Sequence, residues 1–178
     1  MLQIRNDFEI VEKLRKNPAH IRKLAEELKL VPSTVMRIVK RLEQEKIVDF
    51  STQGKNKVYF LKKTPEAKKY LFMTEEYKSL KILQNTKLRM IIKELEEGTQ
   101  GELIVLFGSY AKGTAKKDSD IDIYIETDNR KIREKLRTIS EKLSIKMGKF
   151  DKDNLLTKEI IKNHTILQNT SRFYQLTK

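Results

Sequence analysis

The sequence predicts an α+β protein made of two domains and a helix that links them. The N-terminal third repeats a helical apolar period three times and then changes to two short β-type segments. The C-terminal half opens with a buried apolar run and a glycine turn, and a second strand-like run follows that contains two aspartates. At 178 residues the chain is long enough for two small domains with separate cores.

The composition narrows the possible classes of protein. No cysteine and two distant histidines exclude disulfides and disfavour a zinc site. The net charge of +13 favours a polyanionic partner, and residues 1–63 hold 15 Lys and Arg against 8 Asp and Glu, so this charge is densest there. No apolar run approaches the roughly 20 residues of a membrane span, and residues 1–11 lack a signal-peptide core. We therefore expect a cytoplasmic protein with no membrane segment.

Three short helices are predicted in the N-terminal third. Each has an apolar stripe at helical spacing, and turn signals at Asn17-Pro18 and before Pro32 separate them. The stripes are Ile4, Phe8, Val11 and Leu14; Ile21, Leu24, Ala25 and Leu28; and Val35, Ile38, Val39 and Leu42.

Two strands, at 47–51 and 57–61, are expected after the helices. The loop 52–56 joins them into a hairpin, with Gly54 where a positive φ is wanted. Three helices followed by a hairpin define a winged helix-turn-helix domain, which we assign to residues 1–63.

The third helix and the hairpin tip carry the candidate DNA-binding residues. A recognition helix needs donors for base edges, and a wing needs cations for phosphates. The segment 33–48, S-T-V-M-R-I-V-K-R-L-E-Q-E-K-I-V, resembles the DNA-reading part of winged-helix transcription regulators of the multiple-antibiotic-resistance kind, a resemblance that covers about residues 5–63. It implies double-stranded DNA as a partner, and a winged helix used for protein contacts is the alternative. The residues on the outer face of this helix and at the hairpin tip are Ser33, Thr34, Arg37, Lys40, Arg41, Gln53, Lys55 and Lys57.

Residues 64–85 are predicted to form a linker helix. Thr64-Pro65 is a capping signal, Asn85-Thr86 is a plausible break, and a further helix runs to a stop signal at Gly98. The apolar residues of the linker favour homodimerisation through it, and packing onto either domain is the alternative. These residues are Tyr70, Leu71, Phe72, Tyr77 and Leu80.

The stretch 103–126 carries the candidate catalytic chemistry. A buried strand, Leu103 to Phe107, precedes the Gly108-Ser109 turn, where exposed amides and a hydroxyl can hold phosphate oxygens. In the next strand Asp120 and Asp122 alternate with isoleucines, which places the carboxylates about 7 Å apart on one face. Hard divalent cations prefer such oxygen ligands. Together these residues indicate a metal-nucleotide site.

The spacing G-S-x(10)-D-x-D resembles the signature of polymerase-beta-type nucleotidyltransferases, above all the minimal prokaryotic ones. The resemblance covers residues 90 to 178 and implies that Asp120 and Asp122 bind Mg²⁺ (or Mn²⁺), that Gly108 and Ser109 hold a nucleoside triphosphate such as ATP, and that AMP is transferred to a hydroxyl. The family's third carboxylate is missing from the predicted strand 144–150, where Lys146 takes its place and would face the nucleotide. Asp151 and Asp153 lie beyond this strand, and Glu126 lies too far along its own.

The remaining C-terminal segments are a helix marked by Ile132, Leu136, Ile139 and Leu143, a helix at 155–161 and a tail at 165–176, all within a nucleotidyltransferase-like domain at 86–178 with a small mixed sheet. Three functional hypotheses remain open. The chain is an active transferase tethered to DNA, a regulator whose transferase domain binds nucleotide without turnover, or an antitoxin-like module that pairs with a helical toxin-like protein.

Overall fold

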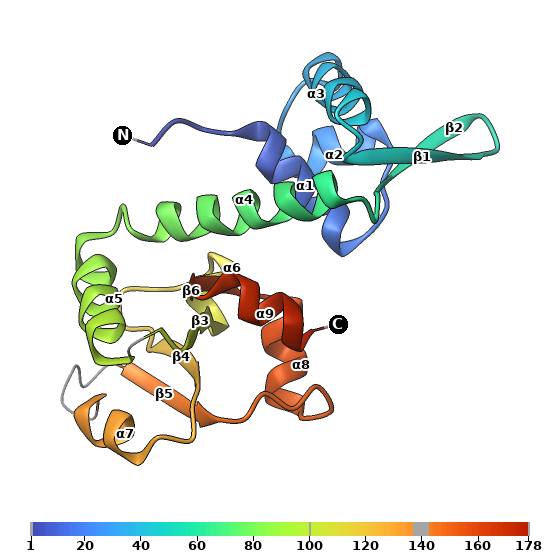
Figure 1. Cartoon of the computed structure of the whole chain (residues 1–178). Coiled ribbons are helices and arrows are strands. Elements are labelled where there is room, and N and C mark those ends of the chain that lie inside the picture. The colour runs from blue at the N-terminus through green and yellow to red at the C-terminus, as the bar shows by residue number, and fades with distance from the viewer. Residues whose placement is uncertain (1, 100, 137–142, 178) are drawn as a thin grey trace. The chain divides into compact units, whose positions relative to one another are not determined.

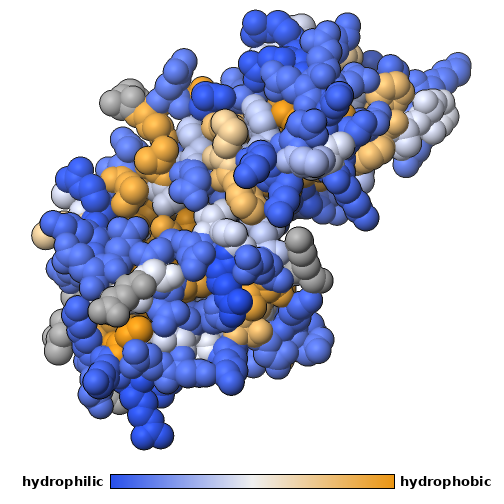
Figure 2. All heavy atoms as spheres, viewed as in Figure 1, coloured by the Kyte–Doolittle hydropathy of each residue, from blue (hydrophilic) through white to orange (hydrophobic). Residues whose placement is uncertain are grey.

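The computed structural model describes residues 2–99, 101–136 and 143–177. It divides into two compact units, Met1–Tyr77 and Lys78–Lys178, whose elements are labelled in Figure 1. Each unit has a hydrophobic core of its own. Both units combine helices with strands, as the predicted α+β class requires. Hydrophilic side chains cover most of the face seen in Figure 2. Within the described ranges, no helix has an apolar stretch long enough to cross a membrane.

Three helices open the N-terminal unit, as the apolar stripes predict: α1 (Asn6–Lys16), α2 (Ile21–Leu28) and α3 (Pro32–Gln44). The turn between α2 and α3 begins at Lys29, which adopts a left-handed conformation with φ 55° and donates its backbone N–H to the carbonyl of Ala25. The stripes bury Leu24, Val39 and Leu42 completely. Ile4 was assigned to the first stripe wrongly: α1 begins at Asn6, and Ile4 is 75% exposed.

The hairpin consists of β1 (Val48–Gln53) and β2 (Asn56–Leu61), paired antiparallel from Val48 opposite Leu61 to Gln53 opposite Asn56. The predicted five-residue loop was therefore too long. Only two residues connect the strands, because Gly54, with φ +59°, allows a tight turn whose twist suits a hairpin. Tyr59 also forms an isolated antiparallel bridge to Ala19, which fixes the hairpin against the helices.

The helix α4 (Pro65–Ile82) starts where the sequence predicts. The hydroxyl of Thr64 accepts a hydrogen bond from the N–H of Ala67 at 3.2 Å, which caps the first turn. Ala67, Tyr70 and Leu71 pack into the core of the N-terminal unit. The first half of this helix thus belongs to the winged-helix unit, which is one of the alternatives that the sequence left open.

The C-terminal unit is built on a four-stranded mixed sheet with the order β5-β4-β3-β6. The strand β4 runs antiparallel to β3 and parallel to β5, and β6 runs antiparallel to β3. The elements are α5 (Thr86–Thr99), β3 (Leu103–Phe107), α6 (Gly108–Lys112), β4 (Ile121–Glu126), α7 (Arg130–Leu136), β5 (Leu143–Gly148), α8 (Leu155–Lys162), β6 (Thr165–Gln168) and α9 (Thr170–Leu176).

Each face of this sheet has its own apolar cluster. On one face Ile121, Ile123 and Ile125 of β4 pack with residues of α5 and α7. On the other face Tyr124 packs with Ile160 of α8 and Phe173 of α9. The alternation along β4 therefore places Asp122 on the α8 and α9 face, near the start of β4 and beside the glycine turn that follows β3.

Three details of this unit differ from the prediction. The tail at 165–176 is in fact a strand, β6, and a helix, α9, which pair with and cover β3. Leu143 was assigned to a helix but begins β5, while Ile139 of the same stripe lies outside the described residues. Gly98 does not stop α5, which continues to Thr99; a Cβ at Gly98 would lie 2.8 Å from Leu136 Cδ2, so glycine here allows α5 and α7 to approach closely.

Candidate functional sites

The glycine turn after β3 lies directly against the second aspartate. Phe107, the last residue of β3, is paired with Asp122 of β4, and Gly108 follows it with φ +66°. A Cβ at Gly108 would lie 2.9 Å from Asp122 Cγ and even nearer to the carboxylate oxygen Oδ2. The position therefore requires glycine for two reasons: its left-handed backbone and the space that Asp122 occupies.

Asp122 is electrostatically unfavourable as an anion in this site. Its pKa is raised above the usual range by partial burial and, next, by repulsion from Asp120. A hydrogen bond from the hydroxyl of Ser144 and the charge of Lys146 oppose this shift without cancelling it. Asp120 itself is exposed just before β4. Asp122 is thus a partly buried carboxylate beside a second acid, and a bound cation would stabilise its ionised form.

The register of the parallel pair β4–β5 places Ser144 opposite Asp122 and Lys146 opposite Tyr124. Lys146 shares the face of Asp122 and is exposed, but it stands one pair further along the strand. The residue beside Asp122 on β5 is therefore a serine, which donates a hydrogen bond to it. The sequence favoured Lys146 for this place, because alternation predicts which face of a strand a residue lies on and not the register of the strand with its neighbour.

A third carboxylate near Asp122 comes from α8. Glu159 raises the pKa of Asp122 through its negative charge, although burial and Asp120 contribute more. Glu159 Oε1 lies 2.8 Å from Lys112 Nζ, at the end of the short helix that starts with Gly108. Sequence reasoning missed Glu159, because it stands 37 positions after Asp122 on a helix with no motif. Among the described residues, no three His, Cys, Asp or Glu side chains are close enough together to hold a metal ion in this arrangement.

The other acids weighed from the sequence lie elsewhere. Glu126 is at the far end of β4, where Arg172 binds it through two nitrogens at 2.6 and 2.8 Å. Asp151 accepts a hydrogen bond from the backbone N–H of Asp153 within a local turn, and both residues are exposed. The loop before β4 is held by the hydroxyl of Ser119, which accepts from the N–H of Lys116 at 2.8 Å.

The predicted DNA-binding residues lie on α3 and the hairpin. Ser33, Arg37, Lys40 and Arg41 are exposed on α3, and Thr34 is half-buried near its start. Gln53, Lys55 and Lys57 are exposed on the hairpin, which is the wing. The structure thus places a set of donors on one helix and a set of donors and cations on the hairpin beside it.

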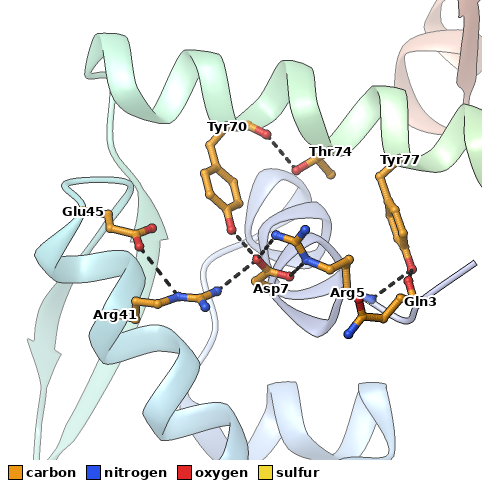
Figure 3. A network of polar contacts seen from close by, with 8 residues as sticks. All are labelled: Gln3, Arg5, Asp7, Arg41, Glu45, Tyr70, Thr74 and Tyr77. Carbon is orange, nitrogen blue, oxygen red and sulfur yellow. Dashed lines mark hydrogen bonds and ion pairs between the residues drawn. The ribbon is translucent and has the colours of Figure 1, made fainter.

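Two of these cations have partners within the protein. Arg41 Nη2 lies 3.0 Å from Asp7 Oδ2, and its Nε lies 3.8 Å from Glu45 Oε1 (Figure 3). The ammonium of Lys57 lies 3.7 Å above the ring of Phe50. Both side chains are therefore positioned by neighbours, and of these only Asp7 comes from outside α3, its C-cap and the wing.

Two further basic residues, from the start of α2, lie close to the wing. A cavity of about 340 Å³ is lined by His20 and Arg22 of the α2 start together with Lys55 and Lys57. His20 Nδ1 accepts the N–H of Lys23 at 3.1 Å and so caps α2. The proximity of His20 and Arg22 to the wing depends on the bridge between Ala19 and Tyr59, and the sequence has no signal for it.

Two family models match this chain. Residues 87–173 match the nucleotidyltransferase domain, and residues 5–49 match a winged helix-turn-helix DNA-binding domain. A putative protein adenylyltransferase of Methanocaldococcus jannaschii, MJ1215, is 51% identical over 39 residues, which are 22% of this chain and 45% of that protein. The chain therefore matches less than half the length of this relative.

Solved structures are also similar to part of the chain. A point variant of ZitR from Lactococcus lactis is 19% identical with a TM-score of 0.37, and covers 56% of this chain and 75% of its own. The transcriptional regulator Tm0710 of Thermotoga maritima is 20% identical with a TM-score of 0.36, and covers 55% of this chain and 76% of its own.

The matched domains, together with the site geometry, define the class of protein. It is a two-domain protein in which a winged helix-turn-helix domain is joined to a nucleotidyltransferase domain. The carboxylates Asp120 and Asp122 and the turn at Gly108 lie in the second domain, and the basic residues of α3 and the wing lie in the first.

Proposed function

We propose that this protein is a DNA-binding transcription regulator whose C-terminal domain binds a nucleoside triphosphate, ATP foremost, with Mg²⁺ or Mn²⁺. The observation that carries the nucleotide part is the pair Asp120 and Asp122, where burial and mutual repulsion raise the pKa of Asp122. Oxygen ligands of this kind suit a hard divalent cation, which would be held by these two carboxylates. When bound, such an ion neutralises phosphate charge.

The residues around the pair have distinct roles in this proposal. The backbone at Gly108 and the hydroxyl of Ser109 are placed to hold phosphate oxygens, because a glycine allows close approach to the backbone. Lys146, exposed on the same face as Asp122, offers a positive charge to the phosphates. The proposed reaction is transfer of AMP from ATP to an acceptor hydroxyl. The hydroxyl oxygen attacks the α-phosphorus and loses its proton, and pyrophosphate leaves. The similarity to a putative protein adenylyltransferase favours a protein hydroxyl as the acceptor.

The experiment for this part uses α-labelled ATP, Mg²⁺ and cell extract. We expect label on a protein with the wild type and none with the variant that combines Asp120→Asn and Asp122→Asn. Asp153→Asn is the control, because Asp153 is, like Asp120, an exposed carboxylate outside the strands, and it follows the end of β5 that pairs with Glu126 and not with Asp122. Equal labelling by wild type and the double variant would contradict the proposed site.

A second candidate function is nucleotide sensing without turnover. It is favoured by the residues of β5, where Ser144 rather than an acid stands opposite Asp122, and by Glu159, which is already paired with Lys112. A carboxylate that accepts the acceptor proton is typically worth about 10²–10⁴-fold in rate. A sensor would show a Mg²⁺-dependent thermal shift with ATP but no transfer, and Ser144→Asp would then gain activity. Robust wild-type transfer that Ser144→Asp does not improve would contradict this candidate.

The DNA part of the proposal rests on the exposed donors of α3 and the cations of the wing. If α3 enters the major groove, Arg37→Ala should cost about 1–3 kcal/mol at a specific site. Lys55→Ala should weaken binding to every duplex and reduce its salt dependence. These effects are measured by titrating labelled duplexes at several salt concentrations. Wild-type affinity and salt dependence in both variants would indicate that the winged helix contacts protein instead.

A further inference from the structure

An arginine-lined cavity lies between the N-terminal segment and α3. It has a volume of about 490 Å³, and its lining residues come from two places in the sequence. The segment before and at the start of α1 contributes Gln3 to Asp7, and α3 contributes Arg37, Ile38 and Arg41. The sequence marked Arg37 and Arg41 as DNA contacts but assigned nothing to Arg5. All three arginines line the same cavity.

Its charge balance is positive. Arg5, Arg37 and Arg41 line the cavity with one acid, Asp7, and Glu45 outside the lining lies 3.8 Å from Arg41, so the three arginines exceed their acidic partners by one charge. Asp7 is 4% exposed and lies under the cavity as the partner of two of the arginines. Arg5 donates from Nε and Nη2 to the two carboxylate oxygens of Asp7 at 3.1 and 2.9 Å, and Arg41 donates from Nη2 at 3.0 Å (Figure 3).

Two tyrosines of α4 help to fix Arg5 and Asp7, the acid that binds both Arg5 and Arg41. The hydroxyl of Tyr70 donates to Asp7 Oδ2 at 2.5 Å, and the backbone N–H of Arg5 donates to the hydroxyl of Tyr77 at 3.0 Å (Figure 3). The guanidinium of Arg5 also lies 4.5 Å from the centre of the Phe8 ring. Positions fixed in this way reduce the entropy that a ligand contact would otherwise cost.

Donors remain for a ligand after these internal bonds. A guanidinium has five N–H groups, of which Arg5 donates two to Asp7, one from Nε and one from Nη2. The side chains of Arg5 and Arg41 are 44% and 52% exposed, so part of each guanidinium faces solvent. Arg37 is exposed and forms no ion pair with any other residue in the described ranges.

From this arrangement we infer that the cavity binds a phosphate group, and that the group belongs to the DNA backbone beside the bases that α3 contacts. The inference rests on the proposed DNA binding and adds Arg5, with the N-terminal segment, to the interface. Planar guanidinium forks suit the oxygens of a phosphate. Because Arg37 and Arg41 project from α3, a helix in the major groove would bring the flanking phosphates to this cavity.

The test measures binding to a labelled duplex of arbitrary sequence over a range of salt concentrations. We expect Arg5→Gln to lower affinity about 3–10-fold and to reduce the slope of log affinity against log salt by about 0.9, the value for one phosphate contact. Arg5→Lys keeps the charge, so it should keep the slope and lose part of the affinity. Arg89→Gln, an exposed arginine of α5, has the same charge change and should bind as the wild type does.

The outcomes separate this inference from the proposed function. If the wild type binds no duplex, the DNA proposal and this inference both fail. If the wild type binds and Arg5→Gln has the same affinity and slope, this inference alone fails. A thermal melt confirms that each variant is folded, and Arg5→Lys repeats the test should Arg5→Gln not fold. A last arm adds ATP in EDTA, and displacement of DNA from the wild type but not from Arg5→Gln or Arg5→Lys would make a free nucleotide the occupant instead.

Discussion

Asp7 in the N-terminal unit is buried and Asp122 in the C-terminal unit is half-buried, and their carboxylates are in opposite electrostatic situations. Burial would raise the pKa of Asp7, yet hydrogen bonds from Arg5 and Tyr70 outweigh it and lower the pKa to about 2. Burial also acts on Asp122, and there the neighbouring Asp120 adds repulsion, so its pKa is raised. One carboxylate is satisfied by the protein, and the other has too little positive charge around it.

This difference separates a structural acid from a candidate ligand-binding one. Asp7 joins α1 to α3 through Arg41 and to α4 through Tyr70, so its charge holds the winged-helix unit together. Asp122 receives one hydrogen bond, from Ser144, and lies against a turn that leaves room only for glycine. A charge that the fold does not compensate is destabilising unless a ligand supplies the opposite charge.

The largest expected effect comes from Asp7→Asn. Its lowered pKa means that ionised Asp7 contributes stability above the unfolded pKa, and that this contribution is lost as pH falls toward the folded value of about 2. The substitution should therefore lower the free energy of unfolding at pH 7 by about 2 kcal/mol. Urea titrations at pH 7 and pH 2.5 measure the loss, which should fall to about a third at the lower pH, because that pH is well below the unfolded pKa but still just above the folded one. Equal losses at both pH values would show that the carboxylate charge is not the cause.

Gly108→Ala should have the next largest effect. The backbone at this position is left-handed, a conformation that alanine disfavours by about 1–2 kcal/mol, and the new Cβ would also clash with Asp122. Thermal unfolding measures the loss. Gly113→Ala is a matched control, since Gly113 has a similar φ of +72° but an added Cβ there meets no atom within 4 Å. If both variants lose the same stability, contact with Asp122 does not matter at Gly108.

The smallest effect, and one of opposite sign, is expected from Asp122→Asn with a chelator present. Because the pKa of Asp122 is raised, its ionised form costs stability at pH values above the folded pKa, and this cost is absent at pH values below the unfolded pKa. The variant should be more stable than wild type at pH 7 by up to about 1 kcal/mol. Adding Mg²⁺ and ATP should stabilise the wild type and not the variant. If Asp122→Asn instead destabilises the protein in the presence of the chelator, Asp122 has a structural role like that of Asp7.

The sequence by itself determined the features that depend on local spacing. The stripes of α1 to α3, the turn signals at Asn17-Pro18 and before Pro32, and the alternation of Asp120 and Asp122 with isoleucines each involve residues a few positions apart, because helix and strand periods are short. The glycine turn and the two carboxylates could be recognised for the same reason. Local spacing failed at two places. The turn of the wing is tighter than predicted, and the strand β6 was missed because its four residues are too few for a clear period.

Only the tertiary structure decided which distant side chains meet. Nothing in the sequence pairs Asp7 with Arg41, 34 positions later, or brings Glu159 near Asp122. The register that sets Ser144, and not Lys146, beside Asp122 is likewise a property of two strands together. These contacts arise when separate elements pack to bury their apolar faces, so the charges on their polar faces acquire neighbours that no local pattern specifies. The roles of Arg5, Ser144 and Glu159 therefore became visible only in the fold.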